Sequence, residues 1–178
     1  NNISETTGRV GLTYKITPEV SLYGSYAQSV VPASAGVEPE EGDQIEFGTK
    51  WRPAGTNALF AASVYQLSKT NITRTNPVTN LSEAIGEVRV RGIDLEAKAE
   101  IGAYDFTASY SYLDAEIVEN GTSGNVGNTP ALVSSHIASI WGSRTWENVG
   151  RGDLTAGLGL RFNGGYYFDD TNASGETG

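Results

Sequence analysis

The sequence predicts an all-β fold of about eight antiparallel, meandering strands, and three observations carry this prediction. Apolar and polar side chains alternate along one segment after another, the connections alternate between short and long, and aromatic residues gather near both ends of the apolar faces. A period of two is typical of a strand with one wet face and one dry face. Together the observations favour a segment of a transmembrane β-barrel over a soluble β-sandwich.

The first four strands follow from the alternation of apolar residues. Residues 10–16 and 20–26 form a hairpin around Thr17-Pro18-Glu19, because proline presets a turn geometry. Residues 44–52 form the next strand, and a turn at 53–57 leads into an alanine-rich strand over 58–70. The facing of this fourth strand is ambiguous, because alanine suits either side.

The second half of the chain supplies four more strands, over 87–101, 104–112, 134–145 and 154–163. Within 87–101 the apolar residues are even-numbered before Gly92 (Val88 and Val90) and odd-numbered after it, beginning with Ile93. A parity change at a glycine predicts a β-bulge there. The bulge would place Arg89 and Arg91 on the same face as Asp94.

The connections between these strands are sorted by length. They are short at 17–19, 53–57, 102–103 and 146–152, and long at 31–42, 71–84 and 118–130. Outer-membrane barrels have short periplasmic turns and long extracellular loops, whereas a sandwich has no reason to sort its loops in this way.

Aromatic residues on the apolar faces form two groups, as the two interfaces of a bilayer require. The short-turn group is Tyr14, Trp51 and Tyr104, and the long-loop group is Tyr26, Tyr110, Tyr112 and Phe162. With short turns in the periplasm, both ends of the chain lie on the extracellular side. A complete barrel has its termini in the periplasm, so we expect an interior piece of a larger barrel rather than a closed eight-stranded one.

Composition excludes several other classes of protein. The 178-residue chain has a net charge of −9, so it lacks the positive charge with which nucleic-acid binders neutralise phosphates. It has no cysteine and one histidine, which argues against thiolate metal sites and His-centred catalysis. No run approaches the roughly 18 apolar residues of a membrane-spanning helix, and no signal peptide is visible. We expect no enzyme activity, no metal site, no resident cofactor and no nucleic-acid partner.

Seven collinear blocks resemble the TonB-dependent siderophore receptors of the bacterial outer membrane, especially the ferric-hydroxamate (ferrichrome-type) branch. The blocks are ITPEVSLYGSYAQS (16–29), EPEEGDQIEFGTKWR (38–52), ALFAASVYQLSKTNI (58–72), GEVRVRGIDLEAKAEI (86–101), DFTASYSYLDAEI (105–117), GNTPALVSSHIASIW (127–141) and LTAGLGLRFNGGYYFDDTN (154–172).

The resemblance implies a 22-stranded barrel around an N-terminal plug, with residues 1–178 as a partial barrel domain that lacks the plug, the signal peptide and the last strands. It implies uptake of ferric siderophores across the bacterial outer membrane. The implied partners are the siderophore, the protein's own plug, TonB acting through the missing N-terminal part, and the lipid bilayer. Iron would arrive inside the siderophore. The alternatives are a receptor of this family for another large cargo and a soluble β-rich binding or adhesion module.

Two sets of residues are candidates for function. Charged residues predicted to line the lumen and face the plug are Glu46, Lys50, Asp94, Glu96, Lys98 and Glu100. Groups predicted to contact the cargo near the long loops are Tyr166, Tyr167, Arg89, Arg91 and Gln28, because aromatic and arginine side chains offer an iron chelate apolar surface and hydrogen-bond donors. Tyr167 is included because it keeps the inward parity of the last strand. Pairing of the wall charges with neighbouring strands alone, and a place in the aromatic girdle for Tyr166, remain open.

Overall fold

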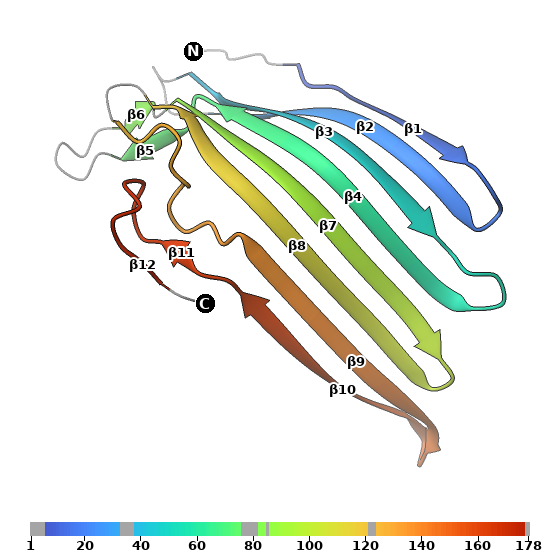
Figure 1. The fold of residues 1–178 in the computed structure, drawn as a ribbon. Helices are drawn as coiled ribbons and strands as arrows, with labels where there is room; N and C mark the ends of the chain where they lie inside the picture. Colours follow the sequence, from blue (N-terminus) through green and yellow to red (C-terminus); the bar gives the residue numbers. More distant parts are fainter. Residues whose placement is uncertain (1–5, 33–37, 76–81, 85, 121–123, 177–178) are drawn as a thin grey trace.

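The computed structural model describes residues 6–32, 38–75, 82–84, 86–120 and 124–176. Eight strands form one antiparallel sheet in the order β1-β2-β3-β4-β7-β8-β9-β10 (Figure 1). Each strand pairs with its neighbour along the chain once the small hairpin β5-β6 is left aside, so the sheet is a meander. The predicted all-β fold and its eight principal strands are confirmed.

The strands are β1 (Arg9–Lys15), β2 (Val20–Val31), β3 (Glu40–Trp51), β4 (Asn57–Thr70), β7 (Glu87–Ile101), β8 (Tyr104–Glu119), β9 (His136–Val149) and β10 (Gly152–Asn163). Two hairpins lie in the connections at the long-loop end: β5 (Thr73–Thr75) with β6 (Ser82–Ala84), and β11 (Tyr166–Tyr167) with β12 (Gly175–Glu176). Strands β2, β3 and β8 run several residues further toward the long loops than the alternation predicts, because their apolar pattern changes there while the backbone pairing continues.

Short turns at the opposite end are stabilised locally. In the β1-β2 turn, the hydroxyl oxygen of Thr17 accepts hydrogen bonds from the backbone amides of Glu19 and Val20, at 3.2 and 3.1 Å. The β7-β8 turn consists of Gly102 and Ala103, and Gly102 has a φ of 61°, which glycine adopts without steric cost. These turns set the register of each hairpin.

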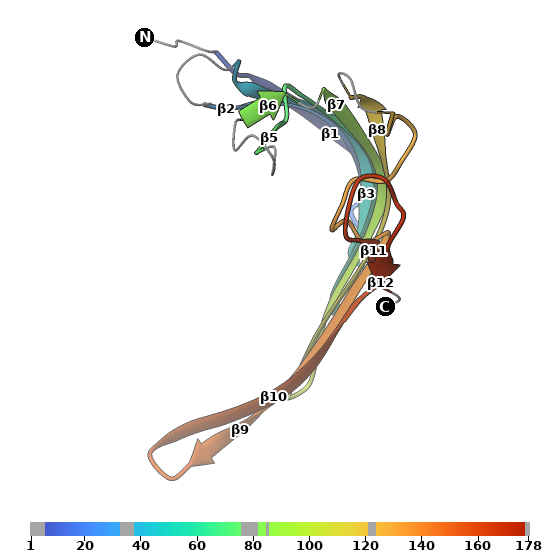
Figure 2. The same ribbon diagram turned by 90° about the vertical axis from the view of Figure 1, so that its left-hand side faces the viewer.

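The sheet is a single curved band, which Figure 2 shows from its side. The buried apolar residues among those described are Val88, Ala115 and Ile117, and all three lie at the long-loop end of β7 and β8. Elsewhere the described part of the sheet has no second layer packed against it. No helix in the described ranges is long and apolar enough to cross a membrane.

The predicted β-bulge at Gly92 is wrong. Pairing of β7 continues without interruption through Gly92, opposite Tyr65 on one side and Leu113 on the other, and the register shift lies instead between Glu87 and Val88. Gly92 serves a different purpose: the Tyr65 ring lies across it and would overlap a Cβ at that position. Tyr23 covers Gly48 in the same way, with its ring 2.5 Å from the point that a Cβ on Gly48 would occupy.

Candidate functional site

The register divides the sheet into two faces. The apolar face carries the even-numbered residues of β1, β2, β4, β8, β9 and β10 and the odd-numbered residues of β3 and β7; the polar face carries the others. The ambiguous strand β4 thereby presents Phe60 and Val64 to the apolar face. Large aliphatic side chains on this face are open, with Leu12 77% and Leu158 78% exposed. Exposed apolar surface on this scale requires an apolar partner.

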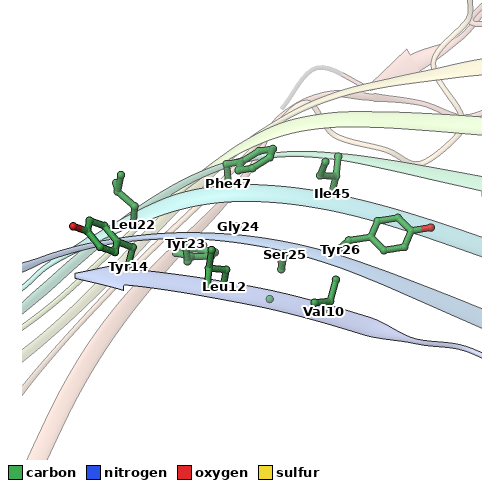
Figure 3. A pocket seen from close by; sticks show the side chains of 11 residues that line it. Val10, Leu12, Tyr14, Leu22, Tyr23, Gly24, Ser25, Tyr26, Ile45 and Phe47 are labelled. Carbon is green, nitrogen blue, oxygen red and sulfur yellow. The ribbon is translucent and has the colours of Figure 1, made fainter. Parts of the chain in front are cut away.

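A shallow depression of about 480 Å³ on the apolar face shows what kind of partner fits. Figure 3 shows its lining side chains around Gly24. Because glycine has no side chain, the backbone of Gly24 forms the floor of the depression. Phe47 leans over this floor, 3.1 Å from the point that a Cβ on Gly24 would occupy. The other main side chains that line the depression are Val10, Leu12, Tyr14, Leu22, Tyr26 and Ile45. A surface of this composition suits hydrocarbon chains rather than water.

The predicted aromatic girdles lie on the apolar face and run obliquely across it. Tyr14 at the short-turn end of β1 is in the same register row as Ala138 of β9, but the aromatic residue at the short-turn end of β9 is Trp146, eight positions further along. Over six strand pairs this shift corresponds to a strand tilt of about 40°, at roughly 3.3 Å per residue and 4.8 Å between strands. Outer-membrane barrels have tilts in this range.

Above the long-loop girdle, the apolar face becomes polar. We call this band the outer rim; it comprises Gln28, Asp43, Gln66, Arg89, Arg91, Asp114 and Glu116. Its members bond to one another. The Tyr26 hydroxyl and the Gln28 amide donate to Asp43 at 2.6 and 3.2 Å. Arg91 donates to Gln66 at 3.1 Å, and Arg89 forms an ion pair with Glu116 at 2.6 Å.

The sequence predicts that Arg89 and Arg91 lie on the same face as Asp94, and this prediction is wrong. Without a bulge at Gly92 they share the face of Ile93, while Val88 and Val90 take the polar face. The change in parity marks a change of surroundings. The outer rim lies beyond the long-loop aromatic residues, whereas the opposite surface is covered at Ile117, which is 1% exposed. The long β8-β9 connection supplies part of that cover, since the Ile117 amide donates to the Asn128 carbonyl at 2.9 Å.

All six charged residues predicted to face a plug lie on the polar face. Glu46 accepts hydrogen bonds from Tyr23 at 2.6 Å and Gln44 at 3.0 Å. Lys50 lies over the Tyr23 ring, 5.2 Å from its centroid. Glu100 accepts a bond from Asn57 at 3.2 Å. These carboxylates are held by neutral donors, which leaves their charge uncompensated at those contacts. Whether they contact a plug stays a prediction.

The predicted cargo-contact residues do not converge on one site. Gln28 lies on β2 beside the β1 edge, whereas Tyr166 and Tyr167 follow β10 at the other edge (Figure 1). The parity argument for Tyr167 does not apply, because β10 ends at Asn163 and the two tyrosines form the separate hairpin strand β11. Tyr166 packs edge-on against Phe168, with ring centroids 5.6 Å apart. Contact of any of these residues with a cargo stays a prediction.

Trp141 is a polar-face residue that sequence reasoning missed. It lies over Gly157 and Gly159, with ring atoms 2.5 and 2.6 Å from the points that Cβ atoms there would occupy, and is 50% exposed. Parity alone gives its side, since it alternates with Ile140 and Gly142. The register adds its contact with glycines on β10, which no pattern within one strand reveals.

The sheet thus has exposed apolar side chains on one face and charged side chains on the other, and its aromatic residues run obliquely across the apolar face. The family model of the TonB dependent receptor-like β-barrel matches residues 1–178. The chain belongs to this family. A TonB-dependent receptor barrel accounts for the two faces, the two girdles and the sorted connections together.

Two relatives and one solved structure show how much of a receptor barrel this chain represents. A ferrichrome outer membrane transporter/phage receptor of Escherichia coli is 37% identical over 175 residues, covering 94% of this chain and 23% of the relative. A ferrioxamine receptor of Yersinia enterocolitica is 30% identical, covering 95% of this chain and 24% of the relative. The solved siderophore receptor PiuA of Acinetobacter baumannii matches with a TM-score of 0.74 at 27% identity, covering 95% and 27%. The chain thus spans about a quarter of the proteins it matches.

Proposed function

We propose that this chain is part of the wall of a bacterial outer-membrane receptor that imports ferric siderophores in a TonB-dependent manner. The observation that carries the proposal is the division of one sheet into a lipid-compatible face, bounded by two oblique girdles, and a charged face. A soluble binding module would have to cover the apolar face with protein, whereas a bilayer covers it directly. Family membership and the names of the relatives agree with this function.

The polar face would line the lumen and meet the plug of the same receptor. Glu46, Lys50, Asp94, Glu96, Lys98 and Glu100 offer mixed charges to a surface that must hold the plug and still release it. Hydrated ion pairs suit this task because they are specific in position but individually weak. The wall itself needs no catalytic group and no resident metal, since iron would pass through as part of the siderophore complex.

We propose a ferric hydroxamate as cargo. Two relatives, at 37% and 30% identity, are named as a ferrichrome transporter and a ferrioxamine receptor. These names agree with the resemblance of the sequence to the ferric-hydroxamate branch. Tyr166 and Tyr167 remain candidates for contact because they lie at the long-loop end, where cargo would enter. Contact of Arg89 and Arg91 with the cargo was predicted because they were expected to face inward. Since they lie on the opposite face, we do not propose this contact.

Uptake by the whole receptor tests the function. The full-length receptor that carries this chain is produced in a strain without other siderophore receptors, and uptake of ferrichrome and ferrioxamine B labelled with radioactive iron is measured with and without TonB. We expect saturable uptake of at least one hydroxamate complex, and its loss without TonB. Uptake of only another class of chelate or cofactor would favour the alternative of a different cargo. A receptor found outside the outer-membrane fraction would overturn the proposal.

A further inference from the structure

Two connections at the long-loop end, far apart in sequence, are bonded to each other. Residues 128–132 precede β9, and residues 167–172 run from the last residue of β11 toward β12; we call their junction the clasp. The Leu132 amide donates to the Tyr167 carbonyl at 2.8 Å, and the Asn128 side chain donates to the Asp170 carbonyl at 2.9 Å. Figure 1 shows β11 and β12 beside the connection that joins β8 to β9.

Asn172 is the central residue of the clasp. Its side-chain oxygen accepts from the Thr129 amide at 2.9 Å, and its side-chain nitrogen donates to the Thr129 carbonyl at 2.8 Å. One side-chain amide thus satisfies both backbone groups of a residue in the other connection, as a paired strand would. Asn172 has a φ of 57°, a conformation that asparagine tolerates better than most residues.

Asp170 supplies the second side-chain contact. Its carboxylate accepts from the Ala131 amide at 2.8 Å. Leu132, the next residue, has a φ of 63°, which is strained for a bulky side chain. Bonds from Asp170 and Tyr167 on either side of this peptide hold the strained conformation in place.

The two connections that the clasp joins both carry exposed apolar side chains, and we call Leu132, Tyr167 and Phe168 the patch. Leu132 is 69% exposed, Phe168 54% and Tyr167 39%. Leu132 comes from one connection and the two aromatic residues from the other, so their arrangement depends on the clasp. Ordering such groups before a ligand arrives removes an entropic cost from binding.

We propose that Asn172 and Asp170 are positioning residues, which hold the two connections together so that the patch of Leu132, Tyr167 and Phe168 is preorganised at the entrance for a ferric siderophore. This inference rests on the proposed function for its cargo. The clasp itself rests only on the contacts above. The two can therefore be tested separately, by a structural readout and by uptake.

The test uses the full-length receptor with Asn172→Gly. Glycine keeps the backbone conformation but removes both side-chain bonds to Thr129. We expect faster hydrogen exchange at the amides of Thr129 and Ala131, and an apparent KM for uptake of labelled ferrichrome or ferrioxamine B raised about tenfold. The maximal uptake rate should stay within about twofold. Asn148→Gly is the matched control, because Asn148 also has a φ of 57° but lies near the end of β9, at the short-turn end of the sheet; it should change neither quantity.

Asp170→Asn is the conservative variant, since it keeps the oxygen that accepts from Ala131, and its KM should stay near that of the unaltered receptor. Asp170→Ala should raise KM as Asn172→Gly does. Unchanged exchange in Asn172→Gly would show that the clasp bonds are not formed. Faster exchange with an unchanged KM, or a lower maximal rate alone, would overturn the positioning role. An unaltered receptor that takes up no siderophore would instead refute the proposed function, whatever the exchange results.

Discussion

Single glycines fix contacts between neighbouring strands of this sheet. Gly48 and Gly92 lie opposite Tyr23 and Tyr65, and each tyrosine ring covers the glycine across from it. Each ring occupies the space on the polar face that a side chain at the glycine would need. The absence of a side chain is therefore a packing requirement at these positions, and we expect them to be intolerant of substitution.

Gly92→Val should destabilise the folded receptor by about 1–3 kcal/mol, the usual cost of overpacking. Denaturant unfolding in detergent measures the change. Gly8→Val is the control, because a Cβ at Gly8 meets nothing within 4 Å, and it should alter stability by less than about 0.5 kcal/mol. Adding Tyr65→Ala to Gly92→Val should relieve the steric overlap. Equal effects at Gly8 and Gly92 would contradict the packing argument.

Strands and their connections change character along their length. On β7 and β8 the outward residues pass from Ile93 and Tyr112 to Arg91 and Asp114 at the same level. The backbone is continuous through this change, so surroundings and not geometry decide which side is polar. The connections beyond the strands are likewise organised, most clearly in the turn that contains Asp169.

This turn supports a prediction about pH. Hydrogen bonds from Thr171 and Ser174 hold the pKa of Asp169 below its ordinary value. A lowered pKa means that the charged form stabilises the turn above the ordinary aspartate range, and that this contribution is lost as pH falls through the lowered value. Amide exchange at Thr171, corrected for its intrinsic pH dependence, should show constant protection from neutral pH to about pH 4 and less protection below it. In Asp169→Asn this loss should be absent; an identical pH profile in the variant would contradict the assignment.

At the scale of the whole molecule, one curved sheet separates two environments. Its outermost strands, β1 and β10, present edges that further strands of a larger barrel would pair. In such a barrel the apolar face would meet the bilayer and the polar face would line the lumen. Substitutions on the same strand should therefore have opposite consequences, depending on the face.

Leu158→Lys should destabilise the receptor by about 2–4 kcal/mol, because Leu158 lies midway along β10 on the apolar face, where a charge would sit near the bilayer midplane. Thr155→Lys places the same charge on the polar face of the same strand and should be tolerated. Folding into lipid vesicles and unfolding by denaturant give both values. Equal tolerance of the two lysines would count against a lipid-facing surface.

Charge reversal on the polar face tests contact with the plug. Exchanging the charges of Glu96 and Lys98 (Glu96→Lys with Lys98→Glu) should lower the maximal rate of siderophore uptake severalfold while the barrel still assembles, because pairing with an oppositely charged plug surface would be lost. Glu147→Lys in the exposed β9-β10 hairpin is the control and should have little effect. Unchanged uptake in the double variant would contradict contact with the plug and would indicate that these charges interact only with neighbouring strands.

Much of this architecture is determined by the sequence itself, because a strand with different surroundings on its two faces must alternate. The eight strands, the sorted connections, the girdle residues and the face of Glu96 or Lys50 all follow from that local rule. Tertiary structure alone decided three other matters. The ring of Tyr65 on a neighbouring strand accounts for Gly92, and the uninterrupted register of β7 puts Arg89 and Arg91 on the face of Ile93. Asn172 bonds to Thr129, which is 43 residues away in the sequence. Each depends on which chain segment lies next to which, and periodicity within one strand carries no information about that.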